Sequence, residues 1–175
     1  MRKYILLLSL CLLAFLAQAQ NENLVTYPAR NKVEWQDFRE IESKKDTSRP
    51  FFFSTSIQMK TIKTNVWTGA TTFETYGITN TIDNWIYKEA KSEQLLGYCQ
   101  LQYDIAHSVA KQLEAHINSK RINGAYEKKM HKIFAEYVSR LNQILRKMDQ
   151  ETQQGSNADI ITQWRTKLAS NTFES

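Results

Sequence analysis

The side chains best suited to nucleophilic or metal chemistry in this sequence are Cys99 and the three histidines. Cys99 precedes His107 by eight residues, which on a helix separates the two side chains by about 12 Å along the axis. His107 and His116 lie nine residues apart, more than about two helical turns, so they cannot bind one metal ion together. A Cys99 nucleophile would need His131, from another helix, as its base. We therefore interpret the histidines as residues at the surface or at the edge of the core.

The segment from Leu95 to Ile105 reads LLGYCQLQYDI. It resembles the active-site helix of a family of secreted zinc proteases, catalogued as domain of unknown function 922, in which this helix reads H-E-Q-x-H-F-D-I. Residues 33–38 (VEWQDF) resemble the family's W-x-D-F element, and residues 148–155 (MDQETQQG) resemble its Y-D-x-E-T-x-H-G element. The resemblance implies a zincin-like α+β fold over nearly all of the chain.

The positions that would carry the chemistry of this family are altered. In an H-E-x-x-H helix, two neutral imidazoles four residues apart bind zinc and the glutamate activates the bound water. The resemblance puts Tyr98 and Gln102 at the two ligand positions, Cys99 at the position of the general base, and Gln154 at that of a third ligand. A phenol must lose a proton with a pKa of about 10 to coordinate well, an amide oxygen is a weak zinc ligand, and a thiol does not replace a carboxylate base.

We therefore expect a catalytically inactive, metalloprotease-like protein with no bound metal, no cofactor and no catalytic residue. Its role would then be to bind a partner, either a peptide or an envelope protein. Two other readings stay open. One is an active hydrolase with a relocated site, built on Cys99 or on a metal held by Asp104, Asp149 and a histidine. The other is a purely structural or assembly role.

Tyr98, Gln102 and Gln154 would lie together if the resemblance holds. Buried polar groups need hydrogen-bond partners, so these three side chains could form a neutral patch in place of a metal. The alternative is a small polar cleft that binds a peptide or glycan without cleaving it. Four large aromatic residues are candidates to line such a cleft, although they are also typical core residues: Trp35, Trp67, Trp85 and Trp164.

Residues 1–19 follow the order of a secretory signal, with two basic residues, an apolar run from Tyr4 to Leu16, and Ala-Gln-Ala at the end. We expect cleavage after Ala19 and export to a periplasm or to the exterior. The run is too short for a permanent transmembrane helix, and no later stretch reaches the roughly 20 apolar residues that spanning requires. The sequence thus predicts no stable membrane span.

Removal of the signal leaves 156 residues, enough for one domain but short for two. We expect a flexible lead-in over residues 20–32 and a single zinc-protease-like domain over residues 33–175. The formal charge falls from +5 to +3, which is too small to indicate a nucleic-acid partner. Cys99 is then the only cysteine, so no intramolecular disulfide can form, and we expect its thiol to be buried.

The elements that must position these residues divide the chain into two halves. Residues 51–79 are rich in β-branched and aromatic side chains and predict strands over 51–60, 61–68 and 71–79, with a turn at Gly69. Apolar residues at helical spacing predict helices over 88–119, 125–151 and 157–169. Strands followed by helices indicate an α+β fold, with an N-terminal antiparallel sheet, two long helices and a shorter C-terminal helix.

Overall fold

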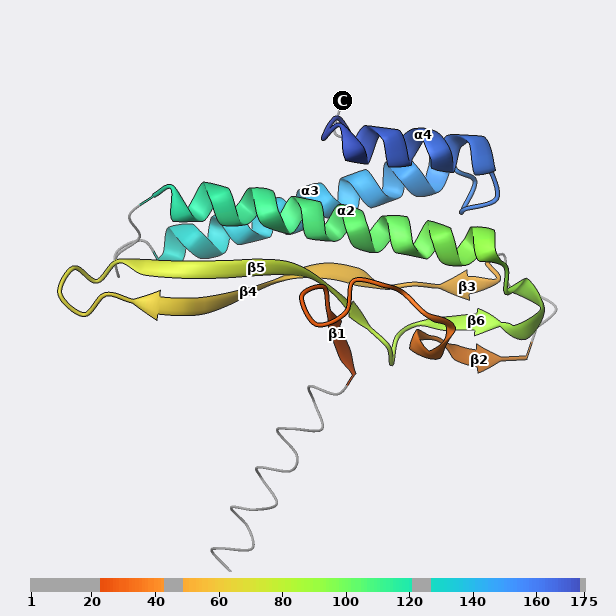
Figure 1. The fold of residues 1–175 in the computed structure, drawn as a ribbon, viewed down its shortest axis with the longest axis horizontal. Helices are drawn as coiled ribbons and strands as arrows, with labels where there is room; N and C mark the ends of the chain where they lie inside the picture. The colour runs from red at the N-terminus through yellow and green to blue at the C-terminus, as the bar shows by residue number, and fades with distance from the viewer. Residues whose placement is uncertain (1–22, 43–48, 121–126, 174–175) are drawn as a thin grey trace, which may run out of the picture.

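The strands occupy the first half of the chain and the helices the second, as the sequence predicts (Figure 1). The computed structural model describes residues 23–42, 49–120 and 127–173. The expected signal over residues 1–19 lies outside these residues. The predicted α+β class is confirmed: antiparallel strands are followed by two long helices and a shorter C-terminal helix.

The larger sheet has the order β1-β5-β4, and its strands are antiparallel. It consists of β1 (Leu24–Thr26), β4 (Thr55–Thr64) and β5 (Thr71–Asn80). Every second residue of β5 is buried, which is the pattern of a sheet with one face on the core. This face meets a helix closely at Gly77, where an added Cβ would come within 2.8 Å of the backbone nitrogen of His107.

The smaller sheet has the order β2-β6-β3 and consists of β2 (Arg39–Ile41), β3 (Phe51–Phe52) and β6 (Trp85–Tyr87). β2 pairs with β6 in parallel, and β3 pairs with β6 in antiparallel orientation. The buried Asn84 connects the two sheets. It accepts a hydrogen bond from the backbone nitrogen of Ser54 and donates one to Oγ1 of Thr79.

Two expectations for the first half of the chain are wrong in part. The predicted strands over 51–60 and 61–68 are instead the short β3 and a continuous β4, which only has an irregular register between Thr61 and Lys63. Polar residues at 60 and 61 do not end β4, because its partner β5 continues alongside. The lead-in expected to be flexible includes β1, which is held by pairing with the end of β5.

The first long helix, α2 (Glu93–Asn118), lies along the larger sheet and is preceded by the 3₁₀ helix η2 (Lys88–Ala90). It starts five residues later than predicted because the side chain of Ser92 accepts a hydrogen bond from the backbone nitrogen of Leu95 and caps the helix. A second 3₁₀ helix, η1 (Trp35–Asp37), lies just before β2.

The other two helices begin and end within two residues of the predicted bounds, as α3 (Glu127–Glu151) and α4 (Ala158–Ala169). α2 and α3 lie on one side of the strands, and α4 lies on the other side of these helices (Figure 1). The core is formed mainly by the face of α2 that meets the sheet and by the inner face of α3. Among the described residues, no helix is both long and apolar enough to cross a membrane.

Candidate functional site

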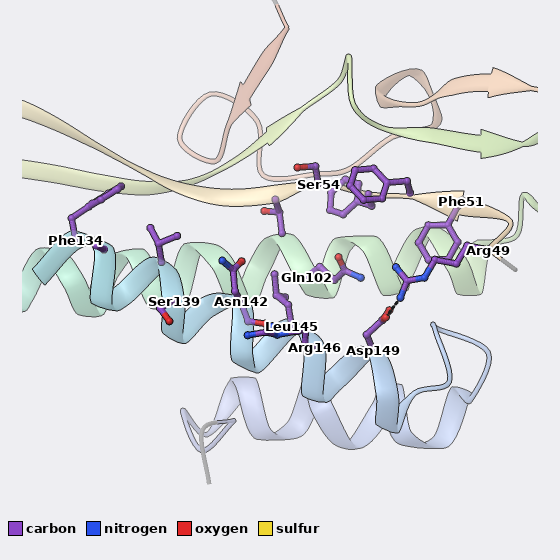
Figure 2. A pocket seen from close by; sticks show the side chains of 15 residues that line it. Arg49, Phe51, Ser54, Gln102, Phe134, Ser139, Asn142, Leu145, Arg146 and Asp149 are labelled. Carbon is purple, nitrogen blue, oxygen red and sulfur yellow. Dashed lines mark hydrogen bonds and ion pairs between the residues drawn. The ribbon is translucent and has the colours of Figure 1, made fainter. Parts of the chain in front are cut away.

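A groove of about 790 Å³ opens between the strands and α3, with α2 beneath it (Figure 2). One wall comes from the segment that contains β3 and the start of β4, and the other from the outward face of α3. Gln102 reaches the groove from α2. The lining residues are Arg49, Phe51, Phe52, Phe53, Ser54, Thr55, Gln102, Phe134, Ala135, Val138, Ser139, Asn142, Leu145, Arg146 and Asp149.

The two ends of the groove differ in chemistry. The part beside the middle of α3 is apolar with hydroxyl and amide groups between, and its residues include Phe134, Val138 and Asn142. The part beside the end of α3 is charged, because Arg49 and Asp149 lie there (Figure 2). Arg146 lies one helical turn before Asp149, and its Nε donates to the carbonyl of Asn142. Together, the two guanidinium groups and one carboxylate leave this part of the groove with an excess of positive charge.

Tyr98 lies under the charged end of the groove and is fully buried. Its hydroxyl donates a hydrogen bond of 2.9 Å to Oδ1 of Asp149, and Arg49 forms an ion pair with the other oxygen of the same carboxylate. Burial raises the pKa of Tyr98, and the charge of Asp149 adds to this rise, whereas Thr152 and Gln102 oppose it by hydrogen bonding. The phenol is therefore protonated and already engaged as a donor.

The ring of Tyr98 is held in place by the turn that follows α3. Gly155 has a φ of 84°, and a Cβ added there would come within 2.7 Å of the ring of Tyr98. Thr152 closes the turn, since its hydroxyl donates to the carbonyl of Met148 and accepts from the backbone nitrogen of Gly155. Phe51 packs edge-on against the same ring at 6.2 Å between centroids.

The structure brings together only part of the predicted cluster. Gln102 and Asp149 both line the groove, and Asp149 is bonded to Tyr98. Gln154, at a φ of 58°, lines a smaller neighbouring hollow of about 430 Å³ that shares Asp149 and the two arginines with the groove. Tyr98 and Gln102 thus lie together, and Tyr98 is bonded to a carboxylate that pairs with a guanidinium.

These side chains do not fit a zinc ion. Zinc sites are built from imidazole nitrogens, thiolates and carboxylates, whereas Tyr98 keeps its proton and Gln102 offers an amide. Asp149 already has two partners. Within residues 23–42, 49–120 and 127–173, no three His, Cys, Asp or Glu side chains are grouped so that they could hold a metal ion.

The relocated metal centre considered from the sequence is not formed. Asp104 accepts hydrogen bonds from Tyr27 at 3.2 Å and from Gln100 at 2.8 Å, at the junction of α2 with the N-terminal segment. Burial raises the pKa of Asp104, and these two hydrogen bonds oppose the rise. Asp149 lies instead at the groove. The two carboxylates therefore line different hollows and do not meet at one site.

The structure does not support a nucleophilic thiol at Cys99, because a substrate could not reach the sulfur atom. Cys99 is fully buried, as predicted, and burial raises the pKa of its thiol, so a reactive thiolate does not form in the folded chain. His107 stacks on the ring of Tyr27 at 3.8 Å between centroids, and burial lowers its pKa. His116 contacts Tyr137, and His131 is exposed. The prediction that the histidines lie at the surface or the edge of the core is confirmed.

Residues that match the family pattern have structural contacts of their own. Gln100 accepts from the backbone nitrogen of Val33 and donates to the carbonyl of Asn31, so it fastens the N-terminal segment to α2. Asp37 is buried, accepts from the backbone nitrogen of Glu34 and forms an ion pair with Arg30. Glu151 accepts a hydrogen bond of 2.8 Å from the indole of Trp164, which is itself fully buried.

Several groove residues were missed from the sequence. Neither Arg49 nor Arg146 was singled out from the sequence as a site residue, although Arg146 stands one helical turn before Asp149 on α3. None of the four tryptophans lines the groove, so the suggestion that they form its walls is wrong. Trp164 belongs to the core, and Trp67 is 97% exposed at the turn between β4 and β5.

Comparisons of this chain with family models, with curated protein sequences and with solved structures give no match. The fold and site therefore define an α+β protein with an amphipathic groove between a strand edge and a helix. Its likeness to the zinc proteases depends on the three short sequence motifs and their order along the chain.

Proposed function

We propose that this chain is an exported, catalytically inactive protein of zinc-protease type, and that its groove binds an extended peptide segment without cleaving it. One observation carries the proposal: an amphipathic groove of about 790 Å³ lies beside α2, the helix whose residues 98–105 resemble the zinc-protease motif. Export rests on the signal-like order of residues 1–19.

The shape of the groove supports a peptide as the ligand. Its volume is in the range of pockets that enclose small molecules or a few amino-acid side chains. Thr55 lines it at the point where β4 begins, and β4 pairs with β5 alone among the described strands. The neighbouring Ser54 is not part of that free edge, because its backbone nitrogen donates to Asn84 and its carbonyl accepts from Thr79. A strand edge with unpaired backbone groups can bind an extended segment by adding it as a further strand.

The charges of the groove support a preference among peptides. Arg49 and Arg146 outnumber Asp149 at one end, while Phe134, Val138 and their neighbours offer apolar contacts further along α3. Guanidinium groups bind carboxylates by paired, charge-assisted hydrogen bonds. The favoured ligand is therefore a segment with apolar side chains followed by an acidic residue or a free carboxyl terminus.

The chemistry at the floor of the groove supports binding without hydrolysis. Peptide hydrolysis at a zinc site needs a metal-bound water and a carboxylate that takes its proton. Tyr98 is engaged as a hydrogen-bond donor, Cys99 is buried away from the groove, and Asp149 is paired with Arg49. Among the residues that line the groove, a bound segment would meet no thiolate and no unpaired carboxylate.

The proposal is tested by selecting ligands for the exported chain from a synthetic peptide library and measuring their dissociation constants by fluorescence anisotropy. Ser139→Trp, which fills the groove from an exposed position on α3, is expected to weaken binding at least about tenfold. The matched control is Gln143→Trp, at an exposed position on α3 that does not line the groove.

Mass spectrometry of the recovered peptides completes the test, and intact peptides are expected. Cleavage of the selected peptides would contradict the inactive part of the proposal. Equal binding by the parent chain and the Ser139→Trp variant would contradict the assignment of the groove.

A further inference from the structure

The turn between β4 and β5 exposes large apolar side chains, and no other element of the described part of the chain covers them. Trp67 is 97% exposed, Val66 is 94% exposed, and Ile62 near the end of β4 is 54% exposed. This hairpin projects past the ends of α2 and α3 at one end of the molecule (Figure 1). A folded chain rarely leaves a tryptophan and a valine side by side in water unless they bind something.

Hydrogen bonds within this turn engage most of its backbone N–H groups. Oδ1 of Asn65 accepts from the backbone nitrogens of Trp67 at 2.9 Å and Thr68 at 3.2 Å. The backbone of Asn65 also pairs with Ala70 and Gly69, at 2.8 and 2.7 Å. Polar backbone groups that are paired internally cost little to move into a medium of low polarity. The turn thus presents its apolar side chains on a hydrogen-bonded frame.

Three lysines lie near the base of the hairpin, together with one acidic residue, Glu74, which is opposite Lys60 on β5. Lys60 and Lys63 are exposed on β4. Lys120 is exposed just after α2, whose end is attached to β5 by two hydrogen bonds between Asn118 and the backbone of Phe73. In an anionic membrane, an apolar interior lies below negatively charged headgroups. An apolar tip with lysines behind it can therefore place its apolar side chains in the interior and its lysines at the headgroups.

We propose that the tip formed by Ile62, Val66 and Trp67 inserts into the surface of an anionic phospholipid bilayer, with Lys60, Lys63 and Lys120 at the headgroups. Tryptophan prefers this interfacial region because its ring is apolar and its N–H is polar. Three side chains at a protruding tip are too small a surface for a stable protein–protein contact, which buries about 800 Å² on each partner. The inference is independent of the peptide-binding groove.

The test is flotation of the chain, recovered after export, with vesicles of phosphatidylcholine that either contain or lack about one quarter phosphatidylglycerol. The parent chain is expected to float with the anionic vesicles, and its tryptophan fluorescence is expected to shift to the blue. Trp67→Ser should weaken binding about tenfold or more. Lys63→Glu should weaken binding several-fold on anionic vesicles only.

Ile82→Ser is the matched control, because Ile82 is 60% exposed in the turn between β5 and β6, away from the tip. It is expected to bind as the parent chain does. Each variant alters an exposed residue, and its folding is checked by circular dichroism. Absence of vesicle binding by the parent chain, or equal binding by Trp67→Ser, would overturn the inference. So would self-association that depends on Trp67 in sedimentation experiments without lipid, since it would identify a second copy as the partner.

Discussion

The contribution of the hydrogen bond between Tyr98 and Asp149 to the free energy of unfolding can be predicted and measured. Tyr98 is fully buried and donates over 2.9 Å to a carboxylate that also pairs with Arg49. Tyr98→Phe removes this donor and leaves the ring in place. A hydrogen bond to a charged acceptor contributes about 1.5–3 kcal/mol. The side chain of Asp149 is 23% exposed, so water can replace the donor, and we expect a loss near the lower end, about 1.5 kcal/mol.

Urea unfolding followed by tryptophan fluorescence measures this loss, and the melting temperature should fall by about 3–6 °C. Asp149→Asn keeps the shape of the acceptor and loses its charge, and we expect it to cost about 1 kcal/mol. In the double variant the two losses should overlap by about 1 kcal/mol, because both remove the same contact.

Tyr137→Phe is the matched control, since it removes a hydroxyl that is only part-buried and lies 3.2 Å from His116. It should cost less than about 0.5 kcal/mol. Equal effects of the two tyrosine variants, or strictly additive losses for Tyr98→Phe and Asp149→Asn, would refute the reasoning about this contact.

Three further predictions concern single residues. Cys99 should react with a thiol reagent at neutral pH only after unfolding, because it is fully buried, and fast labelling of the native chain would contradict this. Gly155→Ala should lower the free energy of unfolding by about 2–3 kcal/mol, because its φ is 84° and the new methyl would clash with the ring of Tyr98. Gly97→Ala, where the methyl meets only the flexible end of an arginine, should be nearly neutral in the same urea experiment. Burial raises the pKa of Asp104, so the contribution of this group to stability falls as the pH rises through the window above its unfolded value. Asp104→Asn removes that titration, and its stability relative to the parent chain should be greatest near pH 7 and decline toward about pH 4.

The helical half of the fold could be predicted because its signals are local. Long apolar stripes at helical spacing place α3 and α4 to within two residues. The start of α2 was missed by five residues, although Ser92 is a recognisable N-cap residue.

The strands were predicted less accurately because their bounds depend on pairing between segments far apart in the sequence. β1 exists through its register with the end of β5, more than fifty residues later in the chain. β4 continues through polar residues because β5 runs beside it. The connection of the two sheets by Asn84 depends on Ser54 and Thr79, which the sequence alone does not bring together.

The candidate site was predicted on one element only. Tyr98 and Gln102 lie four residues apart on a helix, so their common face follows from spacing. Arg49 and Asp149 meet across a hundred residues of sequence, and nothing local in the chain indicates that contact. Gln154 was expected beside Tyr98, but the turn with positive φ after α3 carries it to the neighbouring hollow.

The central claim is that the replaced positions around Tyr98 and Gln102 form a metal-free binding groove. Its most direct test is the zinc content of the exported chain, purified without added metal or chelator and measured by inductively coupled plasma mass spectrometry. The account predicts far less than one zinc ion per chain, because a protonated phenol, an amide and a carboxylate paired with Arg49 are a poor ligand set. One zinc ion per chain that survives dialysis, and is lost on Tyr98→Phe, would contradict it.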